Sequence, residues 1–423
     1  MTHANLEPIA ARSIARRNLE RMAGVAAVAA GFAARFPFAA GKRTATILGV
    51  AAGLNLVLAI AAFAGNAAPS PTAQPPATMH YWAGTFTLSP RIVSKIDRKE
   101  PLTFVDSYPY ITIAGASAQL QAGCEEAANE IGDKSGVRVN CSLIGVPNPD
   151  APTQIEQITS GLNANQYDCL GVDPNPPGAF NNLIDRAMGE GVPVFTVNAD
   201  SQTSKRISVF SDDDYPDAHD MTFANQSGRV AGRYAVKWAK ETHHTFNGKQ
   251  VEIISGDVTQ PWAQGRARGF EETIKAAYPQ VHFIDNWNNM FMVGFDPATV
   301  LSDLQSFMTS HPDVFFYFST DWGGQQIAQI IARHHLQGKV FGLGFNLNAL
   351  LVQQLKQNLL IGTVDQRYDL QGKNWALACA NVLFEHQMPS TQWTYVTPDI
   401  WNSSNIDEAL KIYSKIPNNG VTD

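Results

Sequence analysis

The chain has 423 residues, of which 44% are hydrophobic and 16% are charged. This length and composition exclude an intrinsically disordered protein and leave room for two globular lobes. The formal charge is −7, but residues 1–43 contain seven basic and two acidic residues, so the rest of the chain carries −12. An acidic body of this kind argues against nucleic acid as a partner.

Residues 44–64 form an uncharged run of 21 residues directly after Lys42 and Arg43. The run is long enough to span a bilayer, and its basic flank should stay in the cytoplasm, which sends the rest of the chain outward. The Ala-Phe-Ala triplet at residues 62–64 is also typical of a signal-peptide cleavage site. The sequence therefore predicts either a cleaved signal peptide or a membrane anchor at 44–64, followed by a Pro-rich linker and lead-in at 65–100.

From residue 102 onward, short apolar stretches alternate with amphipathic ones, which predicts a parallel sheet covered by helices on both faces. In the first series the predicted strands are 102–105, 137–144, 167–172 and 192–197, and the predicted helices are 119–131, 153–162 and 177–189. Residues 201–224 then interrupt the series with three consecutive aspartates. We interpret this stretch as a crossing between lobes with solvated acids. A Ca²⁺ site is the lesser alternative, because the EF-hand spacing is absent.

The alternation restarts after the crossing. The predicted helices are 225–241, 261–277, 297–310, 323–334, 349–358, 369–386 and 406–414, and the predicted strands are 251–255, 281–286, 314–318, 340–345, 361–364 and 393–396. Two successive series predict an α/β protein with two similar lobes joined at a hinge. We place the first lobe at 101–211 plus 367–390 and the second at 212–366 plus 391–423.

The four cysteines are Cys124, Cys141, Cys169 and Cys379, and their spacing matches no metal site. A disulfide between Cys124 and Cys141 is one interpretation, because the first helix should run back along the strand that carries Cys141. Buried free thiols are the alternative and the more common state.

Familiar catalytic and nucleotide-binding motifs are absent from the sequence. It contains no G-x-G-x-x-G, P-loop, H-E-x-x-H or G-x-S-x-G motif. Nothing in the residues asks for a cofactor, a metal or a catalytic group, and we predict a binding protein rather than an enzyme.

Polar and aromatic residues recur where predicted strands end, and ligands bind at that edge of open α/β sheets. Carboxylates and amides there can bond to hydroxyl groups, and aromatic rings can cover the C–H faces of a sugar. Taken singly, each residue has a simpler role as a helix cap or a core residue. Their recurrence favours a small-molecule site, and the candidates are Tyr108, Tyr110, Asp173, Asn198, Asp200, Trp262, Arg266, Phe295, Asp321, Asn346 and Gln366.

Trp262 and Arg266 lie one turn apart at the start of the predicted helix 261–277. An aromatic ring beside a guanidinium group suits a polyhydroxylated ligand. The alternative is that Trp262 packs on the loop and Arg266 forms a surface ion pair.

Several stretches together resemble the type I periplasmic sugar-binding proteins of ABC transporters, the ribose- and galactose-binding kind. They include Asn-Gln-Ser-Gly-Arg-Val-Ala-Gly at 225–232, Gln-Gly-Arg-Ala-Arg-Gly-Phe at 264–270, Phe-Asp at 295–296 and Gly-Phe-Asn at 344–346. The resemblance covers roughly residues 102–408. It implies two Rossmann-like lobes with a multi-strand hinge that closes on a sugar. An ABC permease as partner, a monomeric state and a periplasmic or other extracytoplasmic location are implied as well.

The same resemblance assigns roles to single residues. Arg266 matches the ligand arginine and Gln366 the hinge glutamine, while Phe295 matches a stacking position and Asp321 a polar contact. The chain also departs from the family, because Asn346 replaces the usual aspartate and Asn198-Ala199 replaces Asp-Arg of ribose binders. A pentose specificity is therefore not implied. A membrane-anchored sugar sensor with the same fold is the alternative function, and an extracytoplasmic hydrolase is a distant third.

Overall fold

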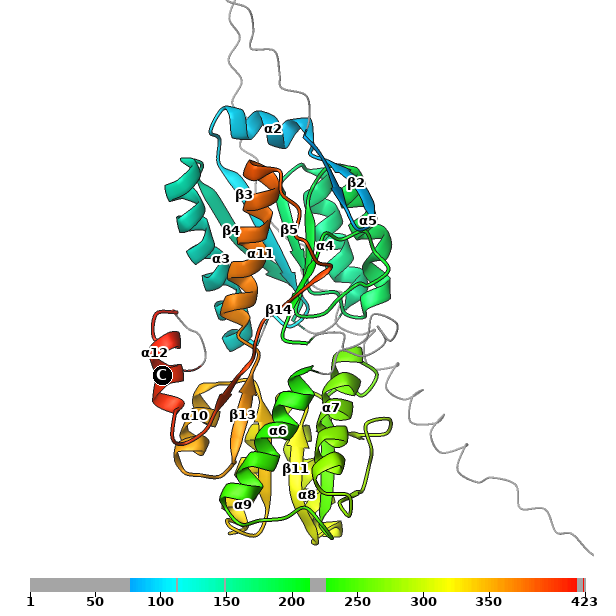
Figure 1. Cartoon of the computed structure of the whole chain (residues 1–423), viewed down its shortest axis with the longest axis vertical. Helices are drawn as coiled ribbons and strands as arrows, with labels where there is room; N and C mark the ends of the chain where they lie inside the picture. Colours follow the sequence, from blue (N-terminus) through cyan, green and yellow to red (C-terminus); the bar gives the residue numbers. More distant parts are fainter. Residues whose placement is uncertain (1–76, 112, 148–149, 214–225, 417–420, 422–423) are drawn as a thin grey trace, which may run out of the picture. The chain divides into compact units, whose positions relative to one another are not determined.

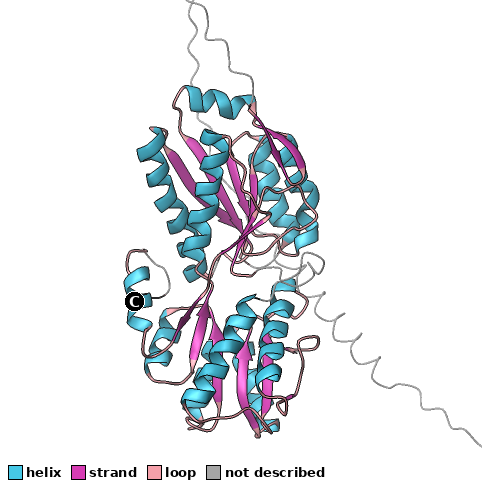
Figure 2. Ribbon diagram, in the orientation of Figure 1, coloured by secondary structure: helices cyan, strands magenta, loops and turns pink. Residues whose placement is uncertain are grey.

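Two sheets with helices on both faces make up the described part of the chain (Figures 1 and 2). The computed structural model describes residues 77–111, 113–147, 150–213, 226–416 and 421. The predicted signal or anchor segment at 44–64 lies outside these residues, and so does Asp214 of the aspartate run. The predicted α/β class with parallel sheets is confirmed, and Pro71–Asp423 forms one compact unit.

The first sheet has the strand order β14-β7-β6-β5-β3-β4, and all its neighbours are parallel. Every residue of the central strands β5 and β6 is buried, because helices cover both faces. The helix α11 returns from far along the chain and packs along α3 (Figure 1). The elements are β3 (Leu102–Tyr108), α3 (Ala114–Ser135), β4 (Val139–Gly145), α4 (Ala151–Asn163), β5 (Cys169–Val172), η1 (Pro177–Phe180), α5 (Asn181–Gly189), β6 (Val194–Val197), β7 (Val209–Ser211), α11 (Tyr368–Ala380), the π-helical turn η2 (Asn381–Glu385) and β14 (Trp393–Tyr395).

A hairpin and a short helix precede this sheet, where the sequence predicted a linker and lead-in. The hairpin is β1 (Thr78–Tyr81) with β2 (Gly84–Thr87), and α2 (Pro90–Asp97) follows it. Met79, Phe86 and Ile92 are buried in the core of the first sheet. The linker prediction therefore ran too far, since residues from 78 onward carry apolar side chains that pack.

The second sheet has the order β10-β8-β11-β12-β13-β15, and the short β9 also pairs with β8. Among the described strands of this sheet, only the pair of β13 with β15 is antiparallel. The elements are α6 (Gln226–Glu241), β8 (Gln250–Ser255), α7 (Pro261–Ala277), β9 (His282–Phe283), β10 (Phe291–Met292), α8 (Pro297–Ser310), β11 (Val314–Ser319), α9 (Gly324–Arg333), β12 (Phe341–Phe345), α10 (Ala349–Lys356), β13 (Gly362–Asp365), β15 (Asp399–Trp401) and α12 (Ile406–Tyr413).

The chain passes between the two sheets after β7, after β13 and after β14. β14 pairs with β7 of the first sheet, whereas β15 pairs with β13 of the second. The predicted boundary at residue 391 is therefore too early, because residues 393–395 still belong to the first sheet. β7 and β15 were missed because three-residue strands leave no periodic pattern.

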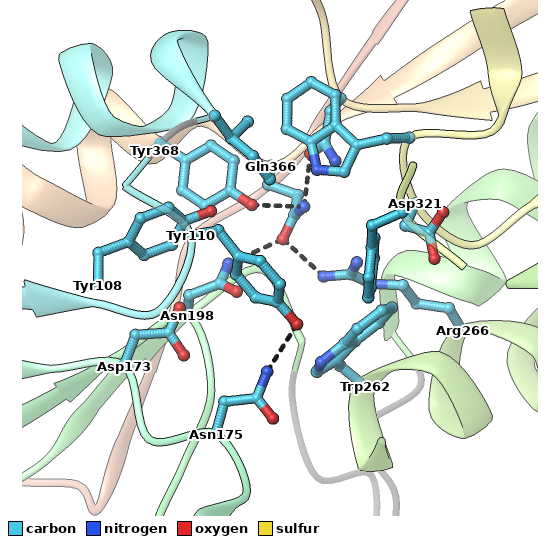
Figure 3. A pocket seen from close by; sticks show the side chains of 14 residues that line it. Tyr108, Tyr110, Asp173, Asn175, Asn198, Trp262, Arg266, Asp321, Gln366 and Tyr368 are labelled. Carbon is cyan, nitrogen blue, oxygen red and sulfur yellow. Dashed lines mark hydrogen bonds between the residues drawn. The ribbon is translucent and has the colours of Figure 1, made fainter. Parts of the chain in front are cut away.

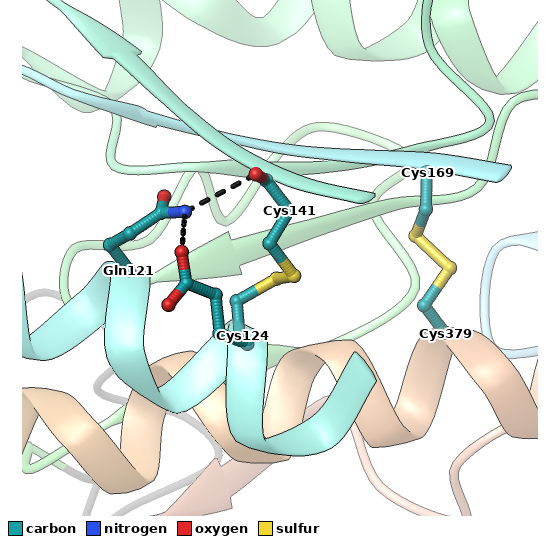
Figure 4. Close-up of a disulfide and its surroundings, with 6 residues drawn as sticks. Gln121, Cys124, Cys141, Cys169 and Cys379 are labelled. Atoms are coloured by element: carbon teal, nitrogen blue, oxygen red, sulfur yellow. Dashed lines mark hydrogen bonds between the residues drawn. A yellow bond between two sulfur atoms is a disulfide. The ribbon is translucent and has the colours of Figure 1, made fainter. Parts of the chain in front are cut away.

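All four cysteines form disulfides, Cys124 with Cys141 and Cys169 with Cys379 (Figure 4). The first joins α3 to the edge strand β4, over a Cα–Cα distance of 5.9 Å. The second joins β5 to α11 over 6.5 Å and links residues 210 positions apart. The free-thiol alternative is wrong, and the second pairing was not predicted. Structural disulfides are typical of proteins in oxidising compartments.

Glu252 on β8 is fully buried, and its carboxylate has no hydrogen-bond partner within the described ranges. Burial and the nearby charge of Asp285 raise the pKa of Glu252 from 4.5 to about 9. The folded state holds this proton more tightly than the unfolded state does. The contribution of Glu252 to the free energy of unfolding should therefore fall as the pH rises from 4.5 towards about 9.

We expect Glu252→Gln to raise the free energy of unfolding by about 1–3 kcal/mol at roughly pH 8, and to change it little at roughly pH 4. Urea denaturation of both proteins at the two pH values measures the difference. Glu156→Gln, at an exposed position on α4, is the control and should have no such pH-dependent effect. An equal gain at both pH values in Glu252→Gln would show that the buried charge is not the cause.

Candidate functional site

A pocket lies where strands of both sheets end, and its empty space, counted with the open mouth, is about 400 Å³. The pocket contains ten of the eleven predicted site residues. Its lining consists of Tyr108, Tyr110, Ile113, Asp173, Asn175, Asn198, Trp262, Arg266, Phe295, Asp321, Trp322, Asn346, Gln366 and Tyr368.

Gln366 lies at the centre of a hydrogen-bond network that joins residues of both sheets (Figure 3). Its side-chain oxygen accepts from Asn198 Nδ2 at 2.8 Å and from an Arg266 guanidinium nitrogen at 2.6 Å. Its Nε2 donates to Asn346 Oδ1 at 2.5 Å and to the Tyr368 hydroxyl at 3.0 Å. The residue directly follows β13, at one of the three crossings, so the network lies on the connection between the two sheets.

The two asparagines in this network occupy corresponding places in the two sheets. Asn198 follows β6 and Asn346 follows β12; β6 is the fourth strand of the first sheet counted from the edge strand β4, and β12 is the fourth strand of the second counted from β10. Both residues have φ of 65°, in the left-handed region that asparagine tolerates better than most residues. An asparagine at each position turns the chain sharply and presents its amide to Gln366.

Arg266 on α7 is almost completely buried, at 3% exposure. One guanidinium nitrogen donates to the Thr320 carbonyl at 3.1 Å, and Nε lies 3.3 Å from Asp213 Oδ2. The second terminal guanidinium nitrogen lies 3.5 Å from Asp212 Oδ1. Burial alone would lower the pKa of Arg266, but Asp212 and Asp213 raise it above its usual value. The alternative of a surface ion pair is therefore wrong, because the charge is held inside the molecule by two carboxylates.

Aromatic side chains form the walls of the pocket. The Tyr110 and Phe295 rings lie 5.3 Å apart between centroids, and the Tyr108 ring lies 6.1 Å from that of Tyr368. Trp262 packs with its ring centroid 5.2 Å from the Arg266 guanidinium carbon, so its ring covers the arginine. Flat apolar walls with polar groups between them suit the faces of a sugar ring.

Two carboxylates reach the pocket, Asp173 after β5 and Asp321 after β11. Burial raises the pKa of Asp173 well above its usual range, the charge of Asp106 adds to this, and Arg266 offsets part of it. Burial also raises the pKa of Asp321, although the Gly256 N–H donates to its Oδ2 at 2.6 Å. Within the described part of the chain, no group of three or more His, Cys, Asp or Glu side chains is placed to hold a metal ion.

Comparison with known proteins identifies the family. The profile of the periplasmic binding protein domain matches residues 107–386, well over half of the chain. The chain belongs to this periplasmic binding protein family. The match confirms the resemblance seen in the sequence, and members of the family work outside the cytoplasm.

Relatives in this family are distant in sequence. A xylose/arabinose-binding protein of Sulfolobus acidocaldarius is 22% identical over 240 residues, which span 55% of this chain and 56% of the relative. A glucose-galactose binding protein from Geobacillus stearothermophilus has 17% identity, covers 72% of this chain and 99% of its own, and superimposes with a TM-score of 0.57. A solute-binding protein of Burkholderia graminis, solved with D-arabinose, has 18% identity. It covers 72% of this chain and 96% of its own, and it superimposes with a TM-score of 0.57. At these identities the solved structures show a shared fold.

The structure departs from the sequence prediction at Asp200, which does not line the pocket. Its carboxylate forms a buried ion pair with Arg206 and accepts from the Thr196 hydroxyl at 2.7 Å. A position at the end of a strand was therefore not enough to predict a ligand contact, because Arg206 in the first lobe already pairs with Asp200.

Four pocket residues are not among the eleven candidates, namely Ile113, Asn175, Trp322 and Tyr368. Asn175 lies two residues after Asp173 in the same loop and donates to the Tyr110 hydroxyl at 2.8 Å. Tyr368 lies two residues after Gln366, at the start of α11. Asn175 and Tyr368 could have been predicted by including the two residues that follow each candidate at a strand end. Ile113 is apolar, and nothing in its sequence position marks it as a pocket residue.

Membrane attachment is not visible in the described residues, none of whose helices is long and apolar enough to cross a bilayer. The candidate segment at 44–64 lies outside them.

Proposed function

We propose that the protein is an exported solute-binding protein that captures a sugar or sugar-like ligand between its two lobes and delivers it to an ABC permease. The observation that carries this proposal is a single pocket built from the strand ends of both sheets, with aromatic walls and polar groups between them. The names of the relatives, which bind xylose, arabinose, glucose or galactose, support a sugar as the ligand.

The position of Gln366 supports a mechanism in which the lobes close about a hinge. Its amide contacts Asn198 from the first sheet and Asn346 from the second. A rotation of one lobe against the other must change these contacts, since Gln366 lies on the crossing from β13 to α11. A ligand that bonds to groups of both lobes stabilises the closed form, and a permease can then recognise that form.

A thermal-shift screen against pentoses, hexoses and polyols tests the proposed function. A ligand that binds only the folded state stabilises it by about 2.7 kcal/mol at a concentration 100 times its Kd. We expect at least one sugar to raise the melting temperature by several degrees. If every sugar and polyol leaves it unchanged, the proposed ligand class is wrong.

The two disulfides support export, because they are rare in the reducing cytoplasm. We propose that residues 44–64 direct the chain outward, either cleaved or kept as an anchor. The intact mass of the protein purified from the cell envelope separates these forms, and an anchored form would favour the sensor alternative. Recovery of the full-length chain from the cytoplasmic fraction would contradict export.

A further inference from the structure

The charges around the pocket do not balance. Arg266 is the single basic residue in the lining formed by the described residues. Its guanidinium group already lies beside Asp212 and Asp213, which are both buried. A bound molecule therefore meets an arginine that already forms ion pairs with Asp212 and Asp213.

Asp173 and Asp321, in contrast, form no ion pair among the described side chains, although the charge of Arg266 lowers the pKa of both. They follow β5 and β11, which are the third strands counted from the edge strands β4 and β10 of the two sheets. Each lobe therefore presents one carboxyl group to the pocket. Figure 3 shows them on opposite sides of Gln366. Asp321 uses one oxygen for the Gly256 N–H and the Ser255 hydroxyl. Burial disfavours the charged form of both carboxyl groups, and a cation between them would favour ionisation.

Further acceptors and aromatic rings surround the same space. The Asn175 side-chain oxygen is buried and has no hydrogen-bond partner in the described structure. The Tyr110 hydroxyl lines the same pocket; burial raises its pKa, and the charges of Asp173, Asp257 and Asp321 raise it further. Six aromatic residues line the pocket, and aromatic faces attract cations. Acceptors, negative charge and aromatic walls together suit an ammonium group.

We propose that the natural ligand is an amino sugar, whose protonated amine lies between the carboxylates of Asp173 and Asp321 while its ring packs between the aromatic walls. This inference rests on the proposed function, because it takes the pocket as a sugar site. A neutral sugar would fill the same pocket and leave both carboxyl groups without a cationic partner.

Isothermal titration calorimetry on matched ligand pairs tests the inference. The pairs are glucosamine with glucose, galactosamine with galactose and mannosamine with mannose, and the N-acetylated forms are uncharged controls. At a pH below the amine pKa of about 8 we expect an amino sugar to bind at least about tenfold more tightly than its neutral counterpart. The preference should decline as the pH rises through that pKa, because the amine loses its charge.

Asp173→Asn and Asp321→Asn should each reduce the preference for the amino sugar to near onefold, whatever their effect on neutral sugars. Asp257→Asn is the matched control, since Asp257 follows β8 but does not line the pocket, and it should keep the preference. If a neutral sugar binds as tightly as its amino counterpart, the inference is overturned and the proposed function stands. If no member of any pair binds and the wider sugar screen is also negative, both are wrong.

Discussion

Arg266→Ala is expected to lower the free energy of unfolding by about 3–5 kcal/mol and to abolish measurable ligand binding. The arginine is 3% exposed and compensates two buried carboxylates, so its removal leaves Asp212 and Asp213 side by side without a counter-charge. It also removes the 2.6 Å hydrogen bond that holds the Gln366 oxygen. Urea denaturation measures the first effect and calorimetry with the sugar found by screening measures the second.

Arg268→Ala is the matched control, two residues further along α7. Arg268 pairs with Glu272 at 2.8 Å near the surface, and ion pairs of that kind contribute about 0–1 kcal/mol. A loss of stability in Arg266→Ala no larger than in Arg268→Ala would contradict the buried ion network. The resemblance assigned Arg266 a role in ligand binding, and its buried ion pairs predict a role in stability as well.

Replacing Cys169 and Cys379 together with serine is expected to cost about 4–5 kcal/mol of unfolding free energy. The Cys169–Cys379 disulfide closes a loop across 210 positions. It attaches α11, which follows the second-sheet strand β13 in the chain, to the central strand β5 of the first sheet. Long loops gain most from such a link, because the unfolded chain loses most freedom.

The disulfide between Cys124 and Cys141 spans 17 positions and provides the internal comparison. Chain entropy predicts that its serine double variant loses about 2 kcal/mol less than the Cys169/Cys379 variant does. Denaturation of the two variants under identical oxidising conditions measures both losses. An equal or larger loss for the shorter loop would show that chain entropy does not set the order.

Helices with a clear start signal were predictable from sequence. α7 and α8 have the predicted bounds, Pro261–Ala277 and Pro297–Ser310. Proline opens both, and at α8 Asp296 caps the helix by accepting from the Thr299 N–H at 2.9 Å. The hairpin of β1 and β2 was not predicted, since its stability depends on packing against a sheet that begins later in the chain.

The site was predictable where it follows from strand ends and unpredictable where it depends on distant partners. Asp173 and Asp321 follow central parallel strands, and both line the pocket. The partner of Asp200 is Arg206, and no pattern in the sequence separates this buried ion pair from a ligand contact. The bond from Cys169 to Cys379 was likewise hidden, because α11 returns to the first sheet only after the whole second sheet has formed.

The central claim is that ligand binds in the pocket around Gln366, at the junction of the two sheets. The most direct test is the calorimetric Kd of the best sugar for the wild type and for Gln366→Ala, with Gln354→Ala as control. Gln354 is a buried glutamine on α10 that does not line the pocket. We expect Kd to rise at least about 100-fold in Gln366→Ala, roughly 2.7 kcal/mol, and to stay within about threefold in Gln354→Ala. An unchanged Kd in a folded Gln366→Ala protein would place the ligand elsewhere and contradict the account.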